Sequence, residues 1–96
     1  MLEPGLDELL RALAHPDRRL FLRSCRGRAH SAGELVALSA LSAATVSEHL
    51  KVLRKTGLLV ADRDGKKWLY RTDPDVVERV IVSTRAEIGA TEADRS

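Results

Sequence analysis

Residues 41–59 read LSAATVSEHLKVLRKTGLL, and this stretch decides the fold. Ser42 is a good helix N-cap, and the residues that follow it predict a helix over about residues 43–56. The apolar residues within it recur at spacings of four and three, which is the spacing of one buried helical face: Val46, Leu50 and Leu53. Gly57 then ends the pattern as a C-terminal glycine does. The stretch therefore predicts an amphipathic helix whose other face is polar and exposed.

The residues just before this helix predict a second, shorter helix. Ser31 and Glu34 have the spacing of a capping box, in which the serine caps the helix start and the glutamate reaches back. The helix they begin runs from about 32 to 39, with Leu35, Val36 and Leu38 facing inward. Two short helices joined by about four residues form a helix-turn-helix.

The pattern changes period after Gly57. Leu58-Leu59-Val60 and Trp68-Leu69-Tyr70-Arg71-Thr72 read as two strands, and between them Asp64-Gly65 favours a tight hairpin turn. We expect Trp68 and Tyr70, which share one face of the second strand, to pack against the domain. A hairpin directly after the second helix makes the unit a winged helix-turn-helix.

Three further helices are expected outside this unit. The first covers about residues 5–14, the second begins at Pro16 and ends at Gly27, and the last follows Asp73-Pro74 and ends at Gly89. Each carries apolar residues at helical spacing, and residues 90–96 are expected to fray. The fold class is therefore mainly α with a small β-hairpin, in the order α-α-α-α-β-β-α, and residues 1–96 form a single domain.

Composition limits the class of protein. Apolar residues make up 44% of the 96 residues but aromatic residues only 3%, so the core is lean and oligomerisation is expected to add stability. No apolar run is long enough for a membrane span or a signal peptide. Cys25 is the only cysteine, which excludes an internal disulfide. These observations together predict a cytoplasmic protein.

Positive charge is concentrated in the middle of the chain. Residues 42–71 carry seven Lys and Arg against three acidic residues, whereas residues 72–96 carry three Arg against six acidic residues. A solvated charged face is one reading of this pattern, and a docking surface for a polyanion is the other.

Combined with the helix-turn-helix, the charge pattern favours double-stranded DNA as the partner. Small residues at the start of the helix over 43–56 allow close approach in a major groove, and polar residues on its outer face can hydrogen-bond base edges. Basic residues further along the helix and at the hairpin tip are expected to reach phosphates. The expected DNA contacts are Ser42, Ala43, Ala44, Thr45, Ser47, Glu48, His49, Lys51, Arg54, Lys55, Arg63, Lys66 and Lys67.

Residues 41–59, together with the sequence LAHPDR at residues 13–18, resemble the ArsR/SmtB family of winged-helix transcriptional repressors. The resemblance covers about residues 6–88. It implies a homodimer formed by the first and last helices, with DNA binding switched off by an effector. A two-fold dimer places two recognition helices on two half-sites, which predicts an imperfect palindrome as the DNA site. Ala40 is a departure, because the family often has glycine at this turn. A left-handed backbone costs alanine about 1 kcal/mol, so we expect either a shifted turn or a slightly strained one.

The apolar faces of the first and last helices agree with a dimer. They offer more apolar surface than one small domain needs: Leu6, Leu9, Leu10, Leu13, Val77, Val80 and Ile81. The alternative is that these faces only close the core of the monomer.

No metal site and no cofactor are expected. The metal sensors of the family place two cysteines in a Glu-Leu-Cys-Val-Cys pattern, and the matching residues 34–38 here read ELVAL. A second site of the family uses Asp and His around the last helix; Asp73 and Asp75 are present, but residues 74–96 contain no histidine. His15, His30 and His49 lie on separate segments without ligand spacing. Cys25 is interpreted as a small buried hydrophobe rather than a redox sensor.

Two other classes of function fit the sequence less well. A winged helix can bind a partner protein through its polar helix face, but the basic hairpin and the small residues at the helix start favour DNA. An enzyme is not expected, because no catalytic triad, phosphate-binding loop or pair of carboxylates has a workable spacing.

Overall fold

A computed structural model describes residues 3–89 of the chain. The helices and strands follow in the order α1 (Leu6–Leu13), α2 (Pro16–Ser24), β1 (His30–Ser31), α3 (Ala32–Ser39), α4 (Ala43–Lys55), β2 (Leu59–Asp64), β3 (Lys67–Thr72) and α5 (Pro74–Ile88). The strands form an antiparallel sheet in the order β1-β3-β2. The expected winged helix-turn-helix is confirmed, with the short strand β1 as an addition, and the expected frayed tail over 90–96 lies outside the described residues.

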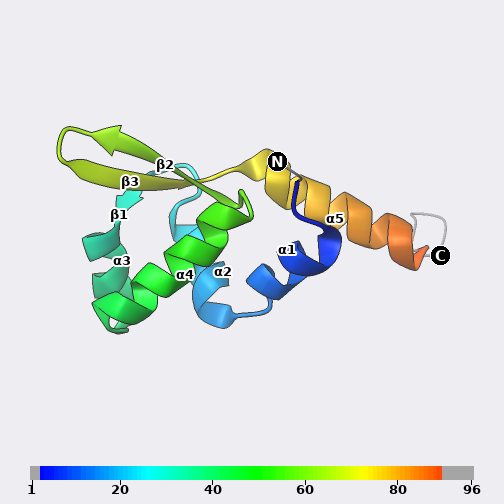
Figure 1. Ribbon diagram of the computed structural model, residues 1–96, viewed down its shortest axis with the longest axis horizontal. Coiled ribbons are helices and arrows are strands. Elements are labelled where there is room, and N and C mark those ends of the chain that lie inside the picture. The colour runs from blue at the N-terminus through cyan, green and yellow to red at the C-terminus, as the bar shows by residue number, and fades with distance from the viewer. Residues whose placement is uncertain (1–2, 90–96) are drawn as a thin grey trace.

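The elements divide into two ends around α2 (Figure 1). The helix-turn-helix α3–α4 and the β2–β3 hairpin lie at one end, and α1 packs against α5 at the other. Helix α2 contacts both α1 and α4 and so joins the two ends. No helix within residues 3–89 is both long enough and apolar enough to cross a membrane.

Helix α4 is positioned by its cap and by its apolar face. The Ser42 hydroxyl accepts a hydrogen bond from the backbone N–H of Thr45 at 3.1 Å. Val46, Leu50 and Leu53 are buried, as expected from their spacing. Full burial of a side chain of this size stabilises the fold by about 1.5–3 kcal/mol. This face therefore holds α4 firmly and leaves the opposite face to solvent.

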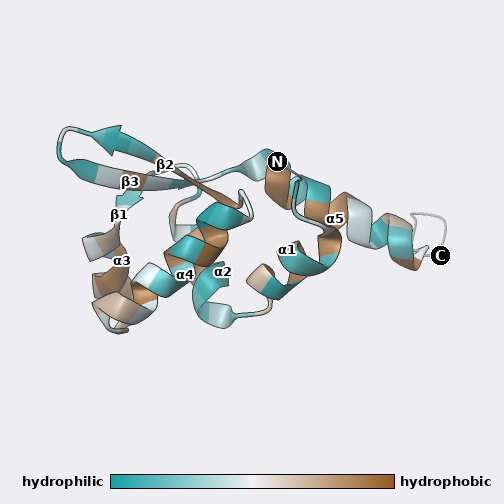
Figure 2. Ribbon diagram, in the orientation of Figure 1, coloured by the Kyte–Doolittle hydropathy of each residue, from teal (hydrophilic) through white to brown (hydrophobic). Residues whose placement is uncertain are grey.

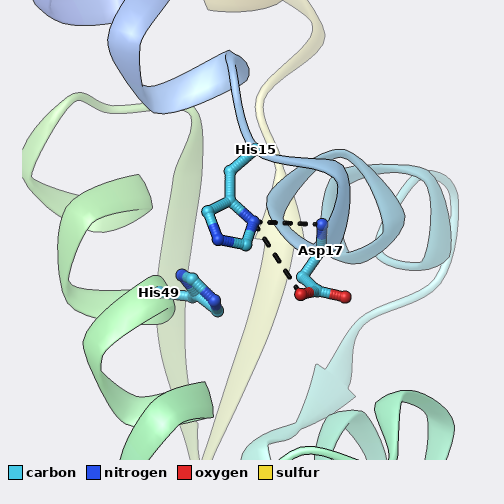
Figure 3. A group of neighbouring side chains, drawn as sticks. All are labelled: His15, Asp17 and His49. Atoms are coloured by element: carbon cyan, nitrogen blue, oxygen red, sulfur yellow. Dashed lines mark hydrogen bonds and ion pairs between the residues drawn. The ribbon is translucent and has the colours of Figure 1, made fainter.

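The prediction that His49 lies on the outer face of α4 is wrong. His49 is only 7% exposed and faces α2, where its Nδ1 accepts a hydrogen bond from Arg18 Nε at 3.2 Å. The rings of His49 and His15 lie with their centroids 4.3 Å apart (Figure 3), and Phe21 lies on α2 beside them. Burial, with the nearby charges of His15 and Arg18, lowers the pKa of His49. His49 therefore docks α4 onto α2 and does not face DNA.

The hairpin turn is shifted by one residue from the expected one. Asp64 pairs with Lys67, so Gly65 and Lys66 form the two-residue loop. Gly65 has a φ of 64°, and glycine at the first loop position suits a type II′ turn. Strand β1 pairs with the other edge of β3, at Leu69 and Tyr70 in the middle of that strand. The sequence does not indicate β1, because two residues are too few to establish an alternating pattern.

Hydrogen bonds tie the end of the hairpin to the helical core. The buried Thr72 hydroxyl donates to the Leu22 carbonyl at 2.7 Å, and the Thr72 N–H donates to the Cys25 carbonyl at 3.2 Å. The Asp73 N–H donates to the Leu58 carbonyl at 3.0 Å. These bonds use backbone groups that would otherwise be buried without a partner. They fix the base of the hairpin, and with it the direction in which the hairpin leaves the core.

The expected dimer faces of α1 and α5 prove to be divided. Leu9 and Val80 are each only 3% exposed within the chain itself, so the prediction that they are available to a second copy is wrong for these two. Both lie on the faces where α1 and α5 pack into the monomer core. Leu10 and Ile81, one residue further along each helix, are 37% and 43% exposed. Leu6, Leu13 and Val77 are partly buried against the core.

The turn between α3 and α4 contains a left-handed alanine. Helix α3 begins with the expected capping box, in which Ser31 and Glu34 exchange both hydrogen bonds at 3.0 and 3.2 Å. It ends at Ala40, which has a φ of 58° and a ψ of 16°. A side chain in this conformation brings Cβ too close to the following carbonyl oxygen. The turn is therefore under the local strain that the sequence led us to expect.

Replacing Ala40 with glycine should relieve this strain. We expect Ala40→Gly to raise the free energy of unfolding by about 0.5–1 kcal/mol, measured by urea denaturation. The matched control is Ala37→Gly, the same change at an exposed position inside α3, which should lower it by about 1 kcal/mol. Equal destabilisation by both variants would contradict the strain.

The pKa of His49 predicts loss of stability in mild acid. The unfolded chain takes up a proton on His49 near its ordinary pKa of about 6.5, whereas the folded chain resists until lower pH. Stability from this group is therefore complete above about pH 6.5 and falls as the pH drops below it. Urea unfolding of the wild type at pH 7.5 and 5.5 should show the loss. The neutral variant His49→Asn should show a smaller one, and an equal loss in both proteins would refute the assignment.

Candidate nucleic-acid interface

The outer face of α4 is exposed and built mainly from small residues. Ala43, Ala44, Thr45, Ser47 and Glu48 are all exposed at the N-terminal half of the helix, where the sequence predicts a reading face. Small side chains allow close approach to base edges, and methyl and hydroxyl groups can meet thymine methyls or hydrogen-bonding groups. The geometry is that of a helix able to enter a major groove.

The hydroxyl of Ser42 already has a structural role. Besides capping the N–H of Thr45, it donates to Thr45 Oγ1 at 2.9 Å. Both groups remain exposed at the start of α4. A contact from either of them to DNA would be made by groups that also hold the helix end.

The predicted phosphate contacts are all exposed. They lie on the C-terminal half of α4 and around the hairpin tip: Lys51, Arg54, Lys55, Arg63, Lys66 and Lys67. Figure 2 shows the hydrophilic tip of the β2–β3 hairpin standing clear of the helices. A polyanionic partner could therefore contact all of these cations without any rearrangement of the core.

The helix and the hairpin share one surface. A groove of about 640 Å³ runs between α3, α4 and β3, lined on the α4 side by Ser47, Lys51, Arg54 and Lys55 and on the other sides by apolar groups that include Val36 and Tyr70. Arg54 of α4 and Arg63 of β2 both lie over the ring of Trp68 on β3. The basic residues of the two elements are therefore held next to one another rather than on separate faces.

Not every cation of the hairpin is free to bind a partner. Arg71 lies 3.7 Å from Asp62 on the neighbouring strand, and the two side chains are half-exposed. An exposed pair of this kind contributes little to stability, but it offsets the charge of Arg71. Among the salt bridges of residues 3–89, none involves Arg54, Arg63, Lys66 or Lys67.

Two histidines that are far apart in the sequence come together with an aspartate. His15, Asp17 and His49 offer ligand atoms within 4.8 Å of one another, the one such group in the described part of the chain (Figure 3). His15 Nδ1 accepts from the Asp17 N–H at 3.3 Å, and His49 Nδ1 accepts from Arg18. A neutral imidazole that accepts at Nδ1 carries its proton on Nε2, so neither nitrogen is a free ligand. With a guanidinium also present, the geometry favours a cap and a docking contact over a cation site.

The positions that bind metals in some relatives of the resembled family have other roles here. Val36 packs against the core, and the carboxylate of Asp73 caps α5 by accepting from the Asp75 N–H at 3.0 Å. The prediction that Leu38 faces inward is wrong, because Leu38 is 53% exposed on α3. Cys25 is fully buried, and burial raises the pKa of its thiol to about 11. A thiol in that state is a weak nucleophile, which agrees with its interpretation as a small hydrophobe.

Sequence reasoning misses two residues that position this surface. The sequence shows Arg18 only as part of the LAHPDR motif, yet it holds His49 and thereby α4. Trp68 is expected from the sequence to pack against the domain, but it is 42% exposed and carries two guanidinium groups on its ring. Neither contact has a local signal, since each joins residues separated by at least five positions and by a turn.

Comparison with known proteins agrees with this geometry. A family model described as a helix-turn-helix domain matches residues 13–61. The HTH-type transcriptional regulator YgaV of Escherichia coli is 37% identical over 78 residues, covering 80% of this chain and 79% of that protein. The HTH-type transcriptional repressor SmtB of Mycobacterium tuberculosis is 33% identical over 82 residues, covering 85% of this chain and 61% of the repressor.

Solved structures give the same result at the level of the whole fold. An ArsR-like transcriptional regulator from Rhodococcus sp. RHA1 superposes with a TM-score of 0.78 at 27% identity, covering 94% of this chain and 83% of that one. Matches in sequence and in fold thus agree with the arrangement of α3, α4 and the hairpin. The chain belongs to the ArsR/SmtB family of winged helix-turn-helix proteins, which are transcriptional regulators and not enzymes.

Proposed function

We propose that this protein is a dimeric repressor that binds an imperfect DNA palindrome. The observation that carries the proposal is the continuous surface formed by the small, exposed face of α4 and the cations of the hairpin. A row of small residues beside a row of cations fits a major groove and its flanking phosphates. The regulators and repressors among its relatives support the same function.

In this proposal the two halves of α4 have different tasks. Ala43, Ala44, Thr45, Ser47 and Glu48 enter the major groove and read base edges, Glu48 by accepting from a cytosine amino group. Cations of the second half of α4 and of the hairpin hold the backbone on either side. His49 is not part of this readout, because it is buried against α2.

The dimer is proposed to form through exposed apolar residues of α1 and α5. Figure 1 shows α1 packed beside α5, at the end of the molecule away from the hairpin tip. Leu10 on α1 and Ile81, Val82 and Ile88 on α5 are large hydrophobic residues that are 37–72% exposed. A second copy related by a two-fold axis would cover them and carry a second α4. Two half-sites roughly 34–36 Å apart, about one helical turn, would then bind together.

Removing hairpin charge should weaken binding to all sequences alike. For Lys66→Ala combined with Lys67→Ala, we expect the slope of log affinity against log salt to fall by about one for each phosphate that is no longer neutralised. Ser47→Ala should instead change the preference among operators selected from random DNA. Gel shifts at several salt concentrations measure both effects, and Arg23→Ala, at an exposed position on α2 outside both proposed surfaces, is the control that should leave the slope unchanged. A loss of specificity from the hairpin variant alone would reverse the assignment.

Placing a carboxylate on the exposed apolar face should separate the dimer. We expect Leu10→Glu and Ile81→Glu to keep the helical circular dichroism of the wild type, because both side chains are exposed in the single chain. Both should sediment as monomers, because a buried unpaired carboxylate costs several kcal/mol, and operator affinity should fall because the second half-site no longer binds in concert. Leu38→Glu on α3, also exposed, should stay dimeric. Dimers that persist in both α1 and α5 variants would place the interface elsewhere.

A further inference from the structure

The ring of Trp68 has two arginines over it, and these arginines come from different elements. The Arg63 Cζ is 4.9 Å from the centroid of the Trp68 ring, and the Arg54 Cζ is 5.6 Å from it. Arg63 sits directly opposite Trp68 in the β2–β3 ladder, whereas Arg54 belongs to the last turn of α4. Both distances are within the range at which an aromatic ring attracts a cation. The indole therefore links the hairpin to the helix.

An indole holds a guanidinium differently from a carboxylate. An ion pair such as Asp62 with Arg71 uses the N–H groups of the arginine and offsets its charge. A ring face attracts the guanidinium but accepts no conventional hydrogen bond, so the charge and the N–H groups stay available to another partner. Arg54 and Arg63 are thus restrained and still positively charged.

We propose that Trp68 is a positioning residue that holds both Arg54 and Arg63 against its ring for contact with DNA phosphates. This inference rests on the proposed DNA-binding function. It adds to that function a residue that does not itself read base edges. A long arginine side chain loses rotamer freedom when it binds, and a side chain restrained beforehand loses less. The ring also fixes the hairpin relative to α4, so the spacing between groove contacts and backbone contacts is set before DNA arrives.

The first test needs no DNA. Trp68 is the only tryptophan in the chain, so its fluorescence reports this site alone. Two neighbouring cations should concentrate iodide and repel caesium, and quenching by iodide should exceed quenching by caesium. Arg54→Ala and Arg63→Ala should each lower that ratio, while Arg85→Ala on α5 should leave it unchanged. If neither Arg54→Ala nor Arg63→Ala changed that ratio, the proposed contact of both arginines with the Trp68 ring would be overturned, whether or not the protein binds DNA.

The second test is a mutant cycle on DNA affinity. Trp68→Leu removes no charge, and we expect it to weaken operator binding by about two- to fivefold per hairpin, which is about four- to twenty-five-fold for a dimer. Trp68→Phe, with a smaller ring, should recover part of this affinity. In a protein that already carries Arg54→Ala and Arg63→Ala, Trp68→Leu should have almost no further effect.

The cycle separates positioning from a merely structural role. If Trp68→Leu only loosened the hairpin, it would also disturb Lys66 and Lys67, and its cost would persist in the protein lacking both arginines. That persistence, or an equal effect of Trp68→Phe and Trp68→Leu, would overturn the inference. If the wild type shifted no DNA in a gel, the proposed function would fail. The quenching experiment would still decide whether Arg54 and Arg63 lie against the Trp68 ring.

Discussion

The docking of α4 onto α2 is the contact on which the rest of the molecule depends. Val46, Leu50 and Leu53 bury the apolar face of α4 in the core, and His49 accepts a hydrogen bond from Arg18 of α2. The C-terminal end of the same helix leads directly into β2, where Leu58 and Leu59 are buried. A rotation of α4 would therefore both hide its small-residue face and swing the hairpin. The surface proposed to bind DNA is therefore held in place by the packing of the core beneath it.

Much of this fold follows from local patterns. The capping box at Ser31, the cap at Ser42 and the glycine after α5 each determine an element boundary through the few residues around them. Ala40 belongs here too, because the family resemblance indicates a strained turn and its φ of 58° agrees. Strand β1 does not follow from a local pattern. Its two residues are too few to show an alternating pattern, and its pairing depends on β3, about forty residues away.

The errors have a common physical cause. The spacing of apolar residues identifies the buried face of a helix but not how wide that face is. His49 is polar, yet it falls three residues after Val46 and four before Leu53, which places it on the buried face of α4. Leu9 and Leu10 present the same difficulty on α1, as do Val80 and Ile81 on α5, because adjacent apolar residues lie about 100° apart on the helix. Which of them meets the core is decided by the packing of α1 on α5, and no local pattern contains that contact. Sequence reasoning therefore found the right helices for each surface and misassigned individual residues on them.

The charges of the hairpin show why counting cations in a sequence is not enough. Arg71 and Asp62 offset one another across the strands, so the hairpin presents less charge than its composition suggests. Arg54 and Arg63, in contrast, meet on an aromatic ring, which restrains them and leaves them positive. The same residue type is thus satisfied within the fold at one position and kept available at two others. What distinguishes them is the neighbour that the sheet register and the last turn of α4 bring to each, and this places the capacity to bind a polyanion where the helix and the hairpin meet.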